Sequence, residues 1–231
     1  MSTLRLVAVT AGMSQPSSTR LLTDRLTEAV RRELADRDPG TEVKVETIEL
    51  RELAVDIAHA MVTGFAAGRL REALDNVAQA DGLIAVTPVF SASYSGLFKS
   101  FFDVLDPKAL IGTPVLIAAT GGSARHSLVL DYAMRPLFSY LKATIVGTGV
   151  FAATADFGSD DAGRSLADRV HRAAGELVGL LAPVPRLGSQ VAAADIAPSP
   201  GRSHSSTVGR PDREPDPFES FVPFAELLGR R

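Results

Sequence analysis

Short apolar runs alternate with amphipathic segments along the first 181 residues. Leu4–Thr10, Gly82–Thr87 and Pro114–Thr120 are rich in apolar residues, which is typical of parallel strands buried on both faces. Glu42–Leu50 alternates charged and apolar residues, the pattern of a half-exposed edge strand. Thr144–Phe151 is predicted as a fifth strand.

Apolar residues recur at helical spacing between these strands. The predicted helices are Thr19–Asp36, Arg69–Ala80, Ser95–Leu105, Ser127–Leu141 and Ser165–Leu181, whereas residues 51–68 stay ambiguous. Strands that alternate with helices indicate an α/β fold, with a parallel sheet covered on both faces. Five strands favour a flavodoxin-like three-layer sandwich with the strand order 2-1-3-4-5, which places the polar strand at an edge.

The predicted helix Ser127–Leu141 contains Pro136. Proline removes one backbone donor and crowds the carbonyl four residues earlier, which belongs to Tyr132, so we expect a kink or π-bulge there. The helix is also apolar nearly all round, which predicts burial on more than one side. Its second partner is either another subunit or the C-terminal segment.

The composition changes after Pro183 and becomes rich in Pro, Gly, Ser and Arg. We therefore expect a flavodoxin-like domain over residues 1–182 and a mobile tail over 183–231. The tail ends in an apolar cluster, which is either a short docking helix or a frayed terminus. Its members are Phe218, Phe221, Val222, Phe224, Leu227 and Leu228.

The overall composition excludes several classes of protein. The net charge is only −3, and no basic stripe indicates nucleic-acid binding. The chain has no cysteine, which rules out disulfides and Cys-ligated metals, and we expect no metal site. Met1 is followed directly by a strand without a signal-peptide pattern, and no apolar run reaches the roughly 18 residues that span a bilayer. We expect a cytoplasmic protein without membrane partners.

The turn after the first strand, residues 11–20, is rich in hydroxyl groups and opens a helix. A helix N-terminus favours an anion, so this turn predicts a phosphate site, although a plain helix cap would look similar. Its donors would be Ser14, Ser17, Ser18, Thr19 and Arg20. Only Gly12 is present where a dinucleotide fingerprint needs three glycines, and Gly147-Thr-Gly149 is expected to pack inside the last strand.

Two further turns belong beside the first at the carboxyl edge of the sheet. The second is a turn fixed by Pro88, and Phe90 can stack there on a planar ring, or pack on a partner chain. The third, residues 120–126, contains two glycines that let the main chain approach a ligand. Together the turns predict an FMN site whose ring is lined by Thr87, Pro88, Val89, Phe90, Ser91, Thr120, Gly121 and Gly122.

Other residues of the third turn have less specific roles. Ser123 can cap the following helix. Arg125 is a candidate clamp for the phosphate of a nicotinamide cofactor, and His126 is expected to contact solvent or a subunit. We expect no catalytic side chain, because no Ser/His/Asp arrangement is evident.

The stretches Ala80–Lys99 and Ala119–His126 resemble the NADPH-dependent FMN reductase family, over roughly residues 4–181. They are most similar to reductases of two-component monooxygenase systems, whose second loop commonly reads Thr-Pro-Val-Tyr where this chain has Phe90. The resemblance also matches Tyr132 to a tyrosine at a π-helix in the subunit interface. The long tail departs from the compact members of the family.

The resemblance implies hydride transfer from NADPH or NADH to FMN in a homodimer or homotetramer, with reduced FMN passed to a flavin-dependent monooxygenase. The polar edge of the ring would meet main-chain amides of Thr120–Gly122. A quinone or azo reductase that retains FMN is the alternative enzyme. A flavodoxin-type electron carrier is disfavoured by the mild charge of the chain.

Overall fold

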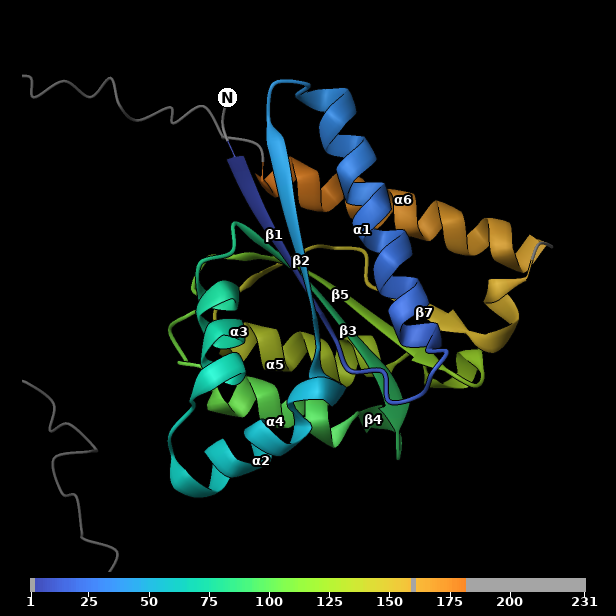
Figure 1. The fold of residues 1–231 in the computed structure, drawn as a ribbon. Helices are drawn as coiled ribbons and strands as arrows, with labels where there is room; N and C mark the ends of the chain where they lie inside the picture. Colours follow the sequence, from blue (N-terminus) through green and yellow to red (C-terminus); the bar gives the residue numbers. More distant parts are fainter. Residues whose placement is uncertain (1–2, 159–160, 182–231) are drawn as a thin grey trace, which may run out of the picture. The chain divides into compact units, whose positions relative to one another are not determined.

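The computed structural model of the protein describes residues 3–158 and 161–181. Figure 1 shows a parallel sheet with helices on both sides. The predicted tail, 183–231, lies outside the described residues together with its apolar end, so the predicted division at residue 182 stays a prediction.

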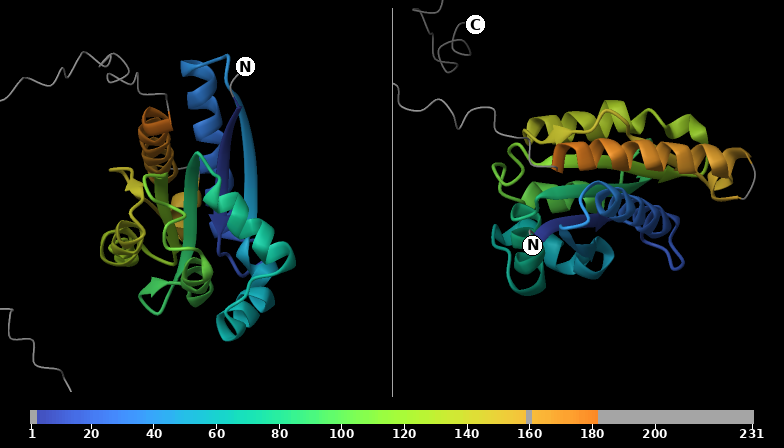
Figure 2. Two further views of the ribbon diagram at one scale, coloured as in Figure 1. Left: turned by 90° about the vertical axis from the view of Figure 1, so that its left-hand side faces the viewer. Right: turned by 90° about the horizontal axis from the view of Figure 1, so that it is seen from above.

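The sheet has the strand order β2-β1-β3-β5, followed by a fifth strand position that is divided into β6 and β7. This is the predicted flavodoxin-like order, with the polar strand β2 at an edge, and Figure 2 shows β1, β3 and β5 side by side. A short strand, β4, pairs antiparallel with β3. The strands are β1 (Thr3–Thr10), β2 (Glu42–Glu49), β3 (Gly82–Phe90), β4 (Ser93–Tyr94), β5 (Pro114–Gly121), β6 (Thr144–Ile145) and β7 (Val150–Ala153).

The two faces of the sheet carry separate apolar cores. Helices α1 and α6 bury residues such as Leu26 and Leu177 against one face, and α2 to α5 bury residues such as Phe98 and Phe138 against the other. The ambiguous residues 51–68 include α2. The helices are α1 (Ser18–Arg37), α2 (Ala54–Thr63), α3 (Gly68–Ala78), α4 (Gly96–Val104), α5 (Arg135–Tyr140) and α6 (Asp161–Leu181).

The predicted helix Ser127–Leu141 is interrupted by a π-helix at Leu130–Met134, directly before α5. This confirms the prediction of a π-bulge near Tyr132. Pro136 cannot donate a hydrogen bond to the carbonyl of Tyr132, so the backbone widens locally to accommodate the missing bond.

The fifth strand was predicted as one continuous element, and this is wrong. Val115 pairs with Ile145 but Ala118 pairs with Val150, so the fifth strand holds two residues more than β5 over the same length. The extra length lies between β6 and β7 and contains Gly147-Thr-Gly149, which was expected inside the strand.

The extra residues between β6 and β7 form a bulge. Side chains from both faces of the sheet bond to its backbone, where strand pairing is interrupted. The carboxylate of Glu176 in α6 accepts bonds from the Thr148 N–H at 2.7 Å and its hydroxyl at 2.6 Å. From the opposite face, the guanidinium of Arg135 donates to the carbonyls of Val146 at 3.2 Å and Gly147 at 3.0 Å. The sequence alone does not show these long-range partners, which explains the error.

Candidate functional site

Buried polar side chains of the described residues gather at the carboxyl edge of the sheet. Each lies in the carboxyl-terminal half of β1, β3 or β5, or at the start of the helix that follows. They are Thr10, Thr19, Thr23, Thr87, Ser95 and Thr120. Because a buried polar group destabilises a fold unless it has a partner, their clustering marks this edge as a functional region.

The three predicted loops start side by side at this edge. The N–H of Ala11 donates to the carbonyl of Val86 at 3.0 Å, which joins the end of β1 to β3. In the neighbouring pair, Pro88 of β3 lies opposite Thr120 of β5. The structure therefore brings together the backbone of all three loops, as the fold rule for α/β sheets requires.

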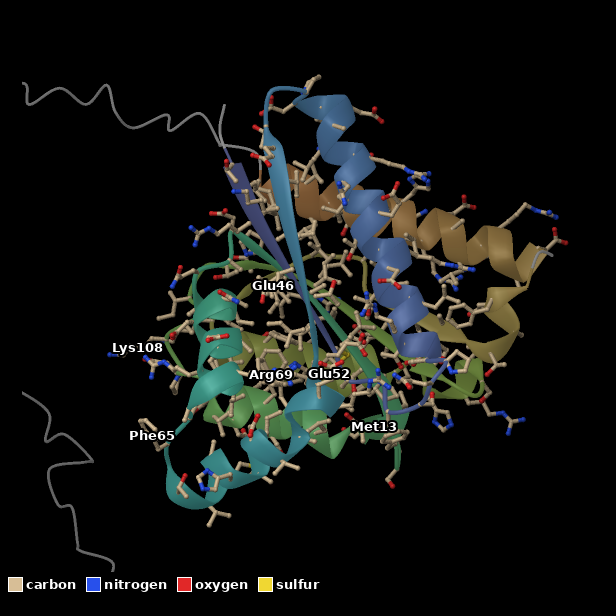
Figure 3. All side chains as sticks on the ribbon, in the orientation of Figure 1. Met13, Glu46, Glu52, Phe65, Arg69 and Lys108 are labelled. Carbon is tan, nitrogen blue, oxygen red and sulfur yellow. The ribbon has the colours of Figure 1, made fainter. Side chains whose placement is uncertain are left out.

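The first loop turns tightly against the start of α1. A β-carbon on Gly12 would lie 2.0 Å from Oγ of Ser17, so only glycine fits here. The Ser17 hydroxyl accepts a bond from the Arg20 N–H at 3.2 Å and caps α1. Ser14 and Ser18 are exposed, as is Met13, which Figure 3 labels in this loop.

The first turn of α1 contains no acidic residue, so no carboxylate within that turn offsets the partial positive charge of the helix N-terminus. Thr19, by contrast, is buried at 2% exposure, and its hydroxyl lies 2.8 Å from the hydroxyl of Thr120. Of the residues predicted to hold phosphate, Ser14 and Ser18 are exposed and Ser17 and Arg20 are half-buried, whereas Thr19 is turned into the core.

Arg20 lies in a network of charges that the sequence did not reveal. Its guanidinium donates to Asp24 at 2.8 Å and to Glu49, whose carboxylate also accepts from Arg51 at 3.0 Å. The hydrogen bond to Asp24, with a further contribution from Glu49, raises the pKa of Arg20 above its ordinary value. The side-chain oxygen of Gln15, oriented toward Arg51, accepts from that guanidinium.

Glu49 was not among the predicted site residues, although a signal for it was present. It is the last residue of β2, and the carboxyl ends of parallel strands meet at one edge. Its pairing means that the charge of Arg20 is partly neutralised before any anion arrives.

The second loop is a hairpin, not the predicted turn fixed by Pro88. Strand β3 continues past Thr87 to Phe90 and returns as β4. Pro88 is tolerated in the strand because the pairing with β1 ends at Val86, so that side of β3 needs no further donor.

The two residues at the tip of this hairpin, Ser91 and Ala92, have φ values of 48° and 67°. Both are in the left-handed region, as a two-residue turn of this type requires, although neither is glycine. Phe90 beside them is 50% exposed, so its ring is available to a flat ligand.

Below the tip, the hairpin is anchored to the start of α4. The hydroxyl of Thr87 accepts a bond from the Ser95 N–H at 3.0 Å and donates to the Pro88 carbonyl at 2.9 Å. Ser95 in turn caps α4 by accepting from the Phe98 N–H at 3.2 Å. These bonds fix the backbone around Pro88 and Val89, which are half-buried.

In the third loop, the two glycines have different surroundings. A β-carbon on Gly121 would lie 2.9 Å from Cζ of Phe151, whereas one on Gly122 would meet nothing within 4 Å. Ser123 begins the following 3₁₀ turn but makes no side-chain capping bond, contrary to the prediction. Arg125 and His126 are exposed.

These features fit a phosphorylated ring system. The first loop offers exposed hydroxyls at a helix N-terminus, and the Gly12 turn is too tight for a side chain. Phe90 offers an exposed aromatic face, and Gly122 offers main chain next to open space. The buried hydroxyl of Thr10, at the end of β1, has no hydrogen-bond partner among the described residues.

Three further observations concern a second groove, metal ligands and membrane-spanning helices. A groove of about 450 Å³ between α1 and α6 is lined by residues such as Arg25, Val170 and His171, none of which belongs to the three loops. Within residues 3–158 and 161–181, no set of three His, Cys, Asp or Glu side chains is placed to hold a metal ion. None of the helices described is both long and apolar enough to cross a membrane.

Comparison with known proteins gives consistent matches. The family model for NADPH-dependent FMN reductase matches residues 4–158. FMN reductase (NADPH) of Pseudomonas aeruginosa is 40% identical over 156 residues, which are 68% of this chain and 80% of that protein. NADH-dependent FMN reductase SfnE of Pseudomonas putida is 44% identical over 157 residues, 68% of this chain and 81% of its own length.

A solved structure is similar over the same region. The X-ray structure of an oxidoreductase from Corynebacterium diphtheriae has a TM-score of 0.75 and is 51% identical in sequence. The match covers 78% of this chain and 98% of that one.

Proposed function

The chain belongs to the NADPH-dependent FMN reductase family, and from that membership we propose that the three loops hold FMN in a defined orientation. The protein is an oxidoreductase that uses FMN and NADPH or NADH. In our proposal the phosphate lies at the first loop, against Ser14, Ser17 and Ser18. The single observation that carries this orientation is the N-terminus of α1, with its exposed hydroxyls and no acidic residue in its first turn.

The ring then lies between the second and third loops. Phe90 supplies an apolar face, and the backbone of Pro88, Val89 and Ser91 borders the ring. Main-chain amides of Gly121 and Gly122 meet its polar edge, where negative charge develops on reduction. When bound, FMN supplies the hydride-accepting chemistry, and the protein aligns the two rings and excludes water.

We propose that FMN exchanges with solvent as a substrate and is not retained as a prosthetic group. Two relatives are named for the reduction of FMN itself, FMN reductase (NADPH) and NADH-dependent FMN reductase SfnE. Reduced FMN that leaves the protein reacts with oxygen unless another enzyme takes it up, so a flavin-dependent monooxygenase is the fitting partner. A cytoplasmic location agrees with this proposal, since nicotinamide cofactors are available there.

We further propose that the π-helix face forms contacts between copies of the chain. Leu128, Tyr132 and Tyr140 are 60%, 79% and 77% exposed, so the apolar outer side of this segment is not covered by residues 3–158 or 161–181. A groove of about 550 Å³ between this segment and α4 is lined by residues such as Tyr94, Tyr132 and Tyr140. Large exposed aromatic side chains around a groove are typical of interfaces.

The test is a steady-state assay of NADPH and NADH oxidation at varied FMN concentrations. An exchanging substrate gives saturation in added FMN and a protein that is colourless after gel filtration. A protein that keeps a stoichiometric flavin through gel filtration, and whose rate does not respond to added FMN, would contradict the proposal. Replacing FMN by a quinone in the same assay tests the alternative reductase activity.

A further inference from the structure

We propose that Thr19 and Thr120 form a positioning pair that sets the distance between the phosphate end and the ring end of the flavin site. This inference rests on the proposed orientation of FMN. It changes the role that the sequence predicts for both side chains, from direct contacts of the cofactor to a tether between two loops that contact it.

The geometry of the pair supports a tether. The two hydroxyl oxygens are 2.8 Å apart, and the residues are 2% and 3% exposed. They are 101 positions apart in sequence. Thr19 lies in the first turn of α1, whereas Thr120 is the residue of β5 directly before Gly121. One buried hydrogen bond therefore joins the helix N-terminus to the third loop.

The surroundings make this bond well defined. On the helix side, the carbonyl of Thr19 accepts a bond from the hydroxyl of Thr23 at 2.8 Å. On the sheet side, Thr120 pairs with Pro88 of β3 and Ala152 of β7, so its backbone is held by neighbours on both sides. Because both backbones are fixed and water is excluded, the hydroxyl pair transmits the position of one loop to the other.

A cofactor with two attachment points is sensitive to the distance between them. The second attachment is favourable only when its partner groups already lie at the correct separation. Riboflavin has the same ring as FMN but no phosphate, so it uses only the ring end. The preference for FMN over riboflavin, the ratio of their dissociation constants, thus reports on the alignment of the two ends.

The experiment measures both dissociation constants by flavin fluorescence titration for the wild type and five variants. Thr19→Val and Thr120→Val each leave one buried hydroxyl without its partner, which lowers thermal stability. The double variant T19V/T120V removes both hydroxyls and regains stability, because two apolar groups of similar shape replace them. Thr120→Ser keeps the hydroxyl and serves as the conservative variant.

We expect the preference for FMN to fall about fivefold in the double variant even though its stability is regained, the change that one neutral hydrogen bond produces. Thr120→Ser should keep the preference of the wild type. Thr27→Val is the matched control, since its hydroxyl is buried on the same helix but has no hydrogen-bond partner among the described residues, and it should leave the preference unchanged.

Two results overturn the inference, and they differ. If the double variant is stable and prefers FMN as strongly as the wild type, the pair only stabilises the fold. If the wild type itself binds riboflavin and FMN equally, the phosphate assignment of the proposed function fails, and the positioning role fails with it.

Discussion

The guanidinium of Arg20, in the first turn of α1, is bound by the carboxylate of Glu49 at the end of β2. The side chains are 38% and 24% exposed, so solvent weakens this pair only in part. Arg20 is thus the cation of the first loop and is already partnered, which limits what it can contribute to an anion.

Glu49→Gln should strengthen FMN binding, because it removes a negative charge beside the proposed phosphate site and releases Arg20. We expect roughly a threefold lower dissociation constant, in line with a partly exposed ion pair. The hydrogen bond to Asp24 raises the pKa of Arg20 above its ordinary value, so Arg20 stays charged and the gain should persist at pH 9. Weaker FMN binding in Glu49→Gln would show that Glu49 supports the loop.

Arg20→Ala combined with Ser18→Ala should weaken FMN binding by a few kcal/mol at most, since charge-assisted hydrogen bonds contribute about 1.5–3 kcal/mol each. Isothermal titration with FMN measures the effect. Arg32→Ala is a matched control, because Arg32 pairs with Glu28 on the same helix but is well exposed. An unchanged dissociation constant in the Arg20 and Ser18 variant would remove the first loop from the site.

Gly12→Ala and Gly122→Ala should separate folding from ligand binding. The added methyl group at residue 12 would collide with Ser17, so Gly12→Ala should lose about 1–3 kcal/mol of stability along with FMN affinity. The same change at Gly122 meets open space, so the protein should melt normally but bind both FMN and riboflavin less tightly. Normal riboflavin binding in Gly122→Ala would place the ring elsewhere.

The hairpin tip offers a prediction about stability. Ala92 holds a φ of 67°, a conformation that costs an ordinary residue about 1–2 kcal/mol relative to glycine. Ala92→Gly should therefore raise the free energy of unfolding in urea by up to about 1 kcal/mol, since the greater freedom of glycine in the unfolded chain offsets part of the gain. Ala92→Val should lower it. The opposite order would mean that the turn adopts another conformation in solution.

The order of the strands could be predicted because each buried strand is a local apolar run in the sequence. The alternation of charged and apolar residues in β2 likewise indicates that it lies at an edge. The π-helix was predictable for the same reason, since Pro136 acts on its own helix. The hairpin after Phe90 was not, because Ser91 and Ala92 lack the Asn-Gly or Gly signal of such turns. Their left-handed backbone is imposed by the pairing of β3 with β4.

The site shows the same division between local and long-range information. The helix cap by Ser17 depends only on neighbouring residues, since a serine just before a helix commonly caps it. The burial of Thr19 depends on Thr120, a residue that is distant in sequence, and the pairing of Arg20 with Glu49 depends on the edge strand. Loop composition therefore located the site, whereas the roles of single side chains required the fold.

Tyr132→Ala should change the oligomeric state or the rate of flavin release, if the π-helix face lies between copies of the chain. Loss of a large aromatic anchor from an interface commonly costs 2 kcal/mol or more, enough to shift the species seen by sedimentation velocity at micromolar concentration. Val62→Ala is a control on α2, since Val62 is 87% exposed there. If Tyr132→Ala changes neither property, the interface role is refuted.

The bulge in the fifth strand yields the last prediction. Glu176 accepts two hydrogen bonds from Thr148 in this bulge. The strand that follows, β7, contains Phe151, which packs next to Gly121 in the third loop. Glu176→Gln keeps the size of the side chain, but its neutral amide makes weaker hydrogen bonds to the N–H and hydroxyl of Thr148 than the carboxylate does. We expect a loss of about 1–2 kcal/mol in stability and weaker binding of riboflavin as well as FMN, because the ring end is disturbed. Glu28→Gln on the exposed face of α1 controls for the change of charge. Lower stability with unchanged flavin binding would show that the bulge supports the sheet without setting the third loop.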